Sequence, residues 1–153
     1  MTGTVEAKLA ALGITLPEAS APAANYVPFV ISGNLLWISG QISMANGSLM
    51  TGKLAGEADI EAGRAAARQC AINLIAQIKA ALGDLDRVKR VVKLVGFVNS
   101  APDFTDQPKV VNGCSDLFVE AFGDAGRHAR SAVGVAQLPF NVSVEVEAVI
   151  EIA

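Results

Sequence analysis

Residues 127–152 read RHARSAVGVAQLPFNVSVEVEAVIEI, and this stretch decides the fold. Apolar residues alternate with other residues over 131–137 and again over 142–152, which is the pattern of two β-strands. The Leu-Pro-Phe-Asn segment between them is typical of a four-residue loop. We therefore predict that the two strands pair directly as an antiparallel hairpin.

The register of this hairpin divides its side chains between two faces. Val133 is expected opposite Val146 and Val135 opposite Val144, and these valines form the core face. Because side chains alternate along a strand, the other face combines charged and small residues: Arg130, Ala132, Gly134, Glu145 and Glu147. Residues four apart on a strand are about 13 Å apart, which leaves room for a small anion and a water between the guanidinium and a carboxylate. A solvated charged face is the alternative interpretation.

The run Arg-Ser-x-Val-x-Val-x-x-Leu-Pro, followed by Val-Glu-Val-Glu-Ala, resembles the C-terminal signature of the RidA family. This family of reactive-intermediate (enamine/imine) deaminases is also called YjgF or endoribonuclease L-PSP. The resemblance spans roughly residues 26–152 and is to a longer branch of the family. It implies a single α+β domain with a chorismate-mutase-like fold, a homotrimer, and ligand clefts at the subunit interfaces.

Composition and charge exclude several classes of partner. The chain has 153 residues, enough for one domain with a substantial core, and a net charge of -3 without a basic block. Nucleic-acid binding depends on clustered positive charge, so we expect no nucleic-acid partner. Residues 19–52 carry no charge, but prolines and glycines interrupt them before any apolar run reaches membrane-spanning length. The start of the chain lacks the pattern of a signal peptide, so we expect a soluble, cytoplasmic protein.

The reactive side chains predict no cofactor. Cys70 and Cys114 are far apart in sequence, and His128 is the one histidine, so a zinc site is excluded. No GxSxG, GxGxxG or Walker sequence is present. We expect neither nucleotide, flavin nor metal, and both cysteines buried within helices in a reducing compartment.

Periodicity and turn residues define the remaining elements. We predict a short helix and connector over residues 1–25, with Thr4 as its N-cap, ahead of a RidA-like domain over 26–153. Within the domain we expect strands and two helices at these positions: 27–31, 35–38, 48–50, 59–83, 88–99 and 106–122. With the final hairpin the order is ββ(β)αβαββ, one mixed sheet with two helices on one face. Two strands are apolar on both faces, so we expect a closed homo-oligomer in which open sheet faces meet.

An arginine and carboxylates in a cleft suit the hydrolysis of an imine or enamine, because such a substrate needs positioning and a water more than a strong nucleophile. Arg130 is expected to bind the substrate carboxylate, and Glu145 to hold or deprotonate the attacking water. The resemblance implies substrates such as 2-aminoacrylate, released as a 2-keto acid and ammonia. Two alternatives remain open: a trimer that binds small carboxylates without turnover, and an endoribonuclease or translation inhibitor.

Other site residues are implied by the resemblance, position by position. Residues 39–41 match the Ser-Gly-Gln element, so Ser39 and Gly40 are candidate ligand contacts, although a strand-end turn is also possible. Tyr26 and Asn112 match a cleft tyrosine and a helix asparagine, with packing roles as the alternatives. Ala132 stands where the family often has cysteine and keeps only the backbone contact, and Gly134 replaces a common acidic residue and widens the pocket. A structural role is expected for His128.

Overall fold

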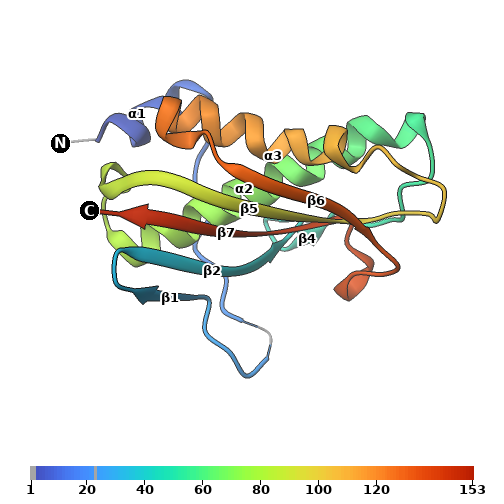
Figure 1. Ribbon diagram of the computed structural model, residues 1–153, viewed down its shortest axis with the longest axis horizontal. Helices are drawn as coiled ribbons and strands as arrows, with labels where there is room; N and C mark the ends of the chain where they lie inside the picture. Colours follow the sequence, from blue (N-terminus) through green and yellow to red (C-terminus); the bar gives the residue numbers. More distant parts are fainter. Residues whose placement is uncertain (1–2, 23) are drawn as a thin grey trace.

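The computed structural model describes residues 3–22 and 24–153; Met1, Thr2 and Ala23 of the expected N-terminal segment lie outside the described residues. The elements follow the predicted order (Figure 1): α1 (Thr4–Ala11), β1 (Phe29–Ser32), β2 (Leu35–Ile42), β3 (Met44–Ala45), β4 (Ser48–Leu49), α2 (Ile60–Leu82), β5 (Val88–Asn99), α3 (Gln107–Phe122), β6 (Ala129–Val135) and β7 (Val144–Ile152). No helix in the described ranges is long and apolar enough to cross a membrane.

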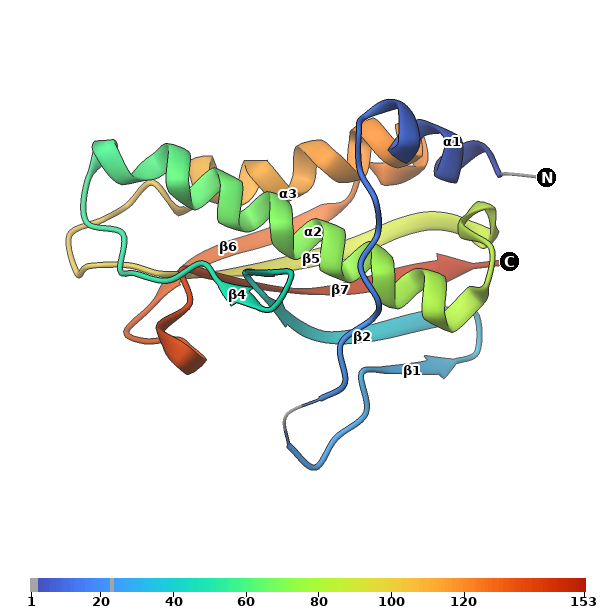
Figure 2. The same cartoon turned by 180° about the vertical axis from the view of Figure 1, so that it is seen from behind.

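The main sheet has five strands in the order β1-β2-β7-β5-β6. β5 and β6 run parallel, joined through α3, and the other neighbours are antiparallel. The helices α2 and α3 lie behind the sheet in Figure 1 and in front of it in Figure 2. This confirms the predicted mixed sheet with two helices on one face.

The core lies between that face and the two helices. One apolar stripe of α2 is buried in full: Ala67, Ala71, Leu74, Ile75, Ile78 and Leu82. Alternate residues of β7 complete the other side of the core: Val144, Val146, Ala148, Ile150 and Ile152. The helices cover only this face of the sheet. Because side chains alternate along a strand, the residues between the buried ones point to the opposite, open face.

The predicted hairpin between the last two strands is wrong, because β5 lies between β6 and β7. β7 pairs with β2 along one edge and with β5 along the other, and its alternate residues are buried beneath the helices. The crossover through α3 instead places β6 parallel to β5 at the edge. The expected pairing of Val133 with Val146 is therefore absent, and Val133 is 44% exposed rather than part of the core.

The open face of the sheet carries apolar side chains, as predicted from strands that are apolar on both sides. Val30, Trp37 and Val133 are each close to half exposed on this face. Val95 and Phe97 of β5 lie between them and are partly exposed. An apolar face of this kind usually marks a contact surface, and the homo-oligomer that would cover it stays a prediction.

The N-terminal helix α1 docks on the same core. Val5 and Leu9 are buried in it, and the backbone amides of Thr4 and Val5 donate to the carboxylate of Asp86 at 2.8 and 2.9 Å. The N-cap residue is Gly3 rather than the predicted Thr4, and glycine has no side chain that could accept a hydrogen bond. Asp86, which is remote in sequence, supplies the acceptor instead. The division of the chain at residues 25 and 26 stays a prediction.

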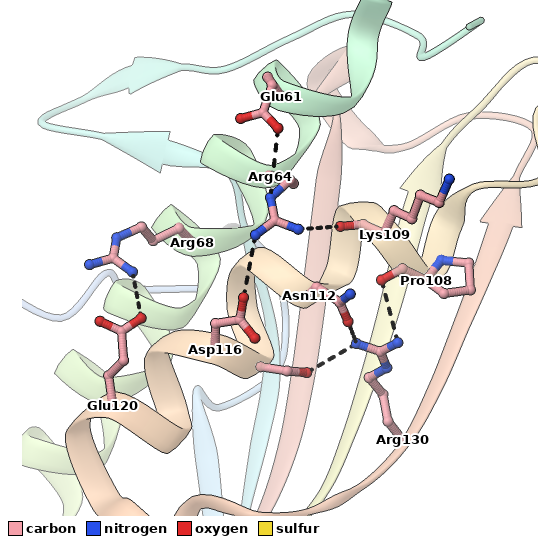
Figure 3. A network of polar contacts seen from close by, with 10 residues as sticks. Glu61, Arg64, Arg68, Pro108, Lys109, Asn112, Asp116, Glu120 and Arg130 are labelled. Carbon is pink, nitrogen blue, oxygen red and sulfur yellow. Dashed lines mark hydrogen bonds and ion pairs between the residues drawn. The ribbon is translucent and has the colours of Figure 1, made fainter. Parts of the chain in front are cut away.

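The two long helices approach each other closely at Gly113 of α3. A Cβ atom there would lie 3.0 Å from Cα of Arg64 in α2 and closer still to its carbonyl oxygen. Arg64 also donates to the Lys109 carbonyl and pairs with Asp116 at 3.3 Å, which fixes the crossing (Figure 3). The glycine that weakens α3 as an isolated helix thus allows it to pack against α2.

Candidate functional site

Arg130 lies on the edge strand β6 and points toward α3, not toward the open face. Its Nη1 donates to Oδ1 of Asn112 at 2.8 Å and to Oγ of Ser115 at 3.2 Å, and its Nη2 donates to the Pro108 carbonyl at 3.4 Å (Figure 3). All three acceptors belong to α3. The guanidinium is therefore held in one orientation by neutral oxygens, and its charge is not paired with a carboxylate within the described residues.

His128 extends this network behind Ser115. Its Nδ1 lies 2.6 Å from the Gly126 carbonyl, which only accepts, so Nδ1 carries the proton. Nε2 lies 2.8 Å from Oγ of Ser115 and therefore accepts a hydrogen bond from the serine hydroxyl. Burial lowers the pKa of His128 below its usual 6.5, the Gly126 hydrogen bond opposes this, and the charge of Arg130 adds to it. Neutral His128 thereby orients the hydroxyl that supports Arg130, which agrees with the structural role expected for it.

Glu145 does not share a face with Arg130, contrary to the sequence prediction. Arg130 aligns with Leu94 of β5 and hence with Ala148 of β7, on the face beneath the helices. Glu145 aligns with Phe97 and Val133, on the open face. The error follows from the hairpin register, since a shift of one residue moves a side chain to the other face. Glu147 occupies the open face as well, paired with Val95.

Gly40 lies directly against the side chain of Glu145. The pairing of β2 with β7 shifts between Ile38 and Gln41, which marks a β-bulge at residues 39–40. A Cβ on Gly40 would lie 2.9 Å from Cδ of Glu145. Burial raises the pKa of Glu145, and the charge of Glu147 raises it further. The bulge thus makes room for a partly desolvated carboxylate.

A cavity of about 620 Å³ opens beside this carboxylate. Glu145, Gly40 and Tyr26 all line it, together with residues of the connector, the β3–β4 turn and the loop before β7. The Ser39 hydroxyl instead donates to the Val27 carbonyl at 2.8 Å, so this side chain anchors the connector. Three of the predicted site residues therefore converge on one cavity, and Ser39 supports its wall.

The other predicted residues gather around Arg130 or in the core. Asn112 touches the guanidinium, and Ala132 packs partly buried against the helices. Gly134 does not widen a pocket, because a Cβ there would lie 2.6 Å from Nε2 of Gln107. One chain thus holds two separate groups, which we call the arginine half-site (Arg130, Asn112, Ser115) and the cavity half-site (Glu145, Gly40, Tyr26).

Some residues of these half-sites were missed from sequence. Ser115 follows Asn112 by three positions in the second helix, so helical spacing would have placed both on one face. The cavity residues Met44, Leu49 and Phe140 carry no local signal, because they come from the two-residue strands β3 and β4 and from the loop before β7, which only the folded chain brings together.

The fold and the two residue groups define a class: an α+β domain with one mixed sheet, two helices on one face, an arginine held between the edge strand and a helix, and a cavity beside a carboxylate. The family model described as "YjgF/chorismate_mutase-like, putative endoribonuclease" matches residues 6–152, and the chain belongs to this family.

Named relatives support the assignment. The chain is 56% identical to Protein TCP17 of Trypanosoma cruzi, covering 99% of this chain and 96% of the relative. It is 31% identical to a 2-iminobutanoate/2-iminopropanoate deaminase of Dermatophagoides farinae, covering 91% and 94%. A crystal structure of a protein with unknown function from Agrobacterium tumefaciens is similar at a TM-score of 0.90 and 51% identity, covering 98% of this chain and 93% of that one.

Proposed function

We propose that the protein hydrolyses imines and enamines that carry a carboxylate, of the 2-aminoacrylate type, to 2-keto acids and ammonia. The observation that carries this proposal is the Arg130 guanidinium, fixed by α3 and not paired with a carboxylate within the described residues. A fixed guanidinium fork suits bidentate binding of a substrate carboxylate. The relative named as an iminobutanoate/iminopropanoate deaminase supports the same chemistry.

We place the complete site between two chains of a homotrimer. Arg130 and Glu145 lie on opposite faces of the sheet, and the β5 residues with which they align are three positions apart. The two side chains of one chain therefore cannot bind the same small molecule. Three residues along a strand alone correspond to about 10 Å. The apolar open face would be covered in a closed oligomer, and the arginine half-site of one chain would meet the cavity half-site of the next.

The reaction needs one water and one proton carrier. Arg130 binds the carboxylate of the imine, and Glu145 accepts a proton from a water as its oxygen attacks the C=N carbon. Glu145 then returns the proton to the nitrogen, which gives a carbinolamine. It next takes the remaining hydroxyl proton as the C=O bond forms and passes that proton to the nitrogen as the C–N bond breaks, so that ammonia leaves. An enamine enters the same path after protonation on carbon. A raised pKa suits Glu145 to these transfers, since it brings the carboxyl closer to the working pH.

Complementation between two inactive variants tests this arrangement. Arg130→Ala and Glu145→Gln are each expected to lose imine hydrolysis, measured as keto-acid release from 2-iminopropanoate generated in place by an amino-acid oxidase. When the two variants are refolded together in equal amounts, about a quarter of the clefts combine an intact Arg130 with an intact Glu145 across an interface. Activity should therefore return to about a quarter of the wild-type value.

The controls separate assembly from chemistry. Sedimentation should give a trimer for the wild type, for both variants and for the mixture. A site contained within one chain predicts no recovery in any mixture, which would contradict the intersubunit arrangement. If wild-type trimer binds pyruvate without hydrolysing the imine, the protein is a carboxylate-binding trimer instead. Salt-sensitive RNA binding would point to the endoribonuclease alternative, which a net charge of -3 does not favour.

A further inference from the structure

We propose that the cavity beside Glu145 receives a bulky apolar side chain of the substrate, and that the connector between α1 and β1 selects for it. The inference rests on the proposed function and names its substrate class: 2-imino acids and enamines derived from large aliphatic or aromatic amino acids. The alanine-derived and serine-derived intermediates, which are the smallest members of the proposed class, would then be hydrolysed with a lower kcat/KM than these larger compounds.

The size of the cavity is the first observation. Its volume of about 620 Å³ lies within the range of sites that enclose whole small molecules. The methyl or methylene group of a three-carbon substrate at Glu145 would leave most of this space to water. A branched aliphatic or aromatic side chain would displace that water from an apolar wall, which is favourable in proportion to the area covered.

The chemistry of the lining is the second observation. Ile42, Met44, Leu49 and Phe140 present apolar surface to the cavity, and the last two are 38% and 64% exposed. Surface of this kind that remains in contact with water gains most from an apolar ligand. Glu145 is the one charged residue among the lining residues.

The polar amides at the cavity are already engaged. Nδ2 of Asn73 donates to the carbonyls of Ile42 and Met44 at 3.0 Å each, and its Oδ1 accepts from Gln69. Nε2 of Gln41 donates to the Ser39 carbonyl, also at 3.0 Å. These groups hold the wall together, so recognition of a polar or charged side chain at this place would require breaking them.

Described residues of the connector form part of the cavity wall. Ser20, Ala21, Pro22, Ala24 and Tyr26 line the cavity, although they precede the first strand of the sheet. Figure 2 shows this segment crossing α2 on its way from α1 to β1.

The connector is attached to the body on both sides of the cavity. Nε2 of Gln77 in α2 donates to the Ser20 carbonyl at 2.9 Å. Toward β1, the backbone amide of Ser39 donates to the Pro28 carbonyl at 2.9 Å. The connector is therefore tied to the body at Ser20 and at Pro28, and the wall residues between these two points limit the length of side chain that fits.

The test compares substrates across one wall residue. Imines are generated from alanine, leucine and phenylalanine, and keto-acid release is measured for three proteins. These are the wild type, Ala21→Phe, which is designed to fill the cavity, and Ala11→Phe, which is the matched control. Ala11 is exposed at the end of α1 and does not line the cavity. We expect wild-type kcat/KM to be about tenfold higher or more for the two large imines than for the alanine imine. Ala21→Phe should lower that ratio about tenfold, and Ala11→Phe should preserve it.

A binding measurement makes the inference independent of turnover. The thermal midpoint of each protein is recorded with pyruvate, 4-methyl-2-oxopentanoate and phenylpyruvate at equal concentration. If the large keto acids raise the midpoint more than pyruvate does, and Ala21→Phe removes the difference, the cavity assignment holds even when no imine is hydrolysed. If pyruvate and its imine perform as well as the large compounds, the assignment is overturned while the deaminase function stands. If none is bound or hydrolysed, both proposals fail.

Discussion

Gly40 and Glu145 lie so close across the bulge in β2 that a Cβ on Gly40 would come within 2.9 Å of the carboxyl carbon of Glu145. Gly40→Ala should therefore displace the carboxylate from the cavity wall. We expect imine hydrolysis to fall about tenfold or more, because a general base depends on its position relative to the water.

A double-mutant cycle separates this contact from any general effect of alanine in β2. Urea unfolding should show Gly40→Ala to be destabilising, by about 1–3 kcal/mol, in the presence of Glu145. In a Glu145→Ala background the same change should cost much less, since the colliding carboxylate is gone. Equal costs in both backgrounds would show that the contact with Glu145 is not the cause.

Gly113 should be nearly irreplaceable for stability. Alanine within a helix normally gains about 1 kcal/mol over glycine, but here the added methyl group collides with the Arg64 backbone. We expect Gly113→Ala to lower the free energy of unfolding by about 2 kcal/mol, measured by urea denaturation. Gly56→Ala is the matched control: its backbone is extended, at φ -161°, and a Cβ there meets nothing within 4 Å. A neutral result for both changes would refute the close packing of α2 and α3.

His128 should make stability depend on pH in the acid direction. Its pKa is lowered in the folded state, chiefly by burial, so the unfolded chain binds a proton first as pH falls below about 6.5. The stabilisation that neutral His128 provides is complete above about pH 6.5. It declines as the pH falls from there through the lower pKa of the folded state. We expect wild type to lose more stability between pH 7.5 and 5.5 than His128→Gln does, as measured by urea unfolding at each pH. Parallel curves for the two proteins would argue against a neutral, buried imidazole.

The cysteines should be unreactive in the native protein. Cys70 and Cys114 are free and fully buried, as expected from sequence. Burial raises the pKa of both thiols; for Cys70 the neighbouring Cys114 and Glu145 add to the effect, and for Cys114 Arg130 opposes it. Reaction with a disulfide reagent such as Ellman's should therefore be negligible before unfolding and should report both thiols in denaturant. Rapid modification of the folded protein would contradict this burial.

Local structure was predictable here because its signals are local. The strand at 88–99 was predicted with the bounds it has, and the second helix begins one residue later than expected, at Gln107. Alternation and helical spacing depend only on neighbouring residues. The order of strands in the sheet depends instead on which surfaces the helices cover, and this is why the direct pairing of β6 with β7 was wrong.

The candidate site was predictable as a set of residues but not as an arrangement. Arg130 and Asn112 do meet, and Tyr26, Gly40 and Glu145 do meet. The separation of the two groups followed from strand order, which inverted the relative faces of Arg130 and Glu145. The width of the cavity depends on turns and on the connector. No periodic pattern in the sequence predicts the contacts of the connector with α2.

The position of β7 has a consequence for biosynthesis. It is the last strand of the sheet to be made, yet it occupies the middle, between β2 and β5. Until Val144–Ile152 has left the ribosome, the strands made earlier form two separate groups whose inner edges have no partner. Unpaired edges of this kind are prone to aggregate. Ribosome stalling upstream of residue 144 should therefore yield a chain that depends on chaperones, and release of the last strand should complete the sheet in one step.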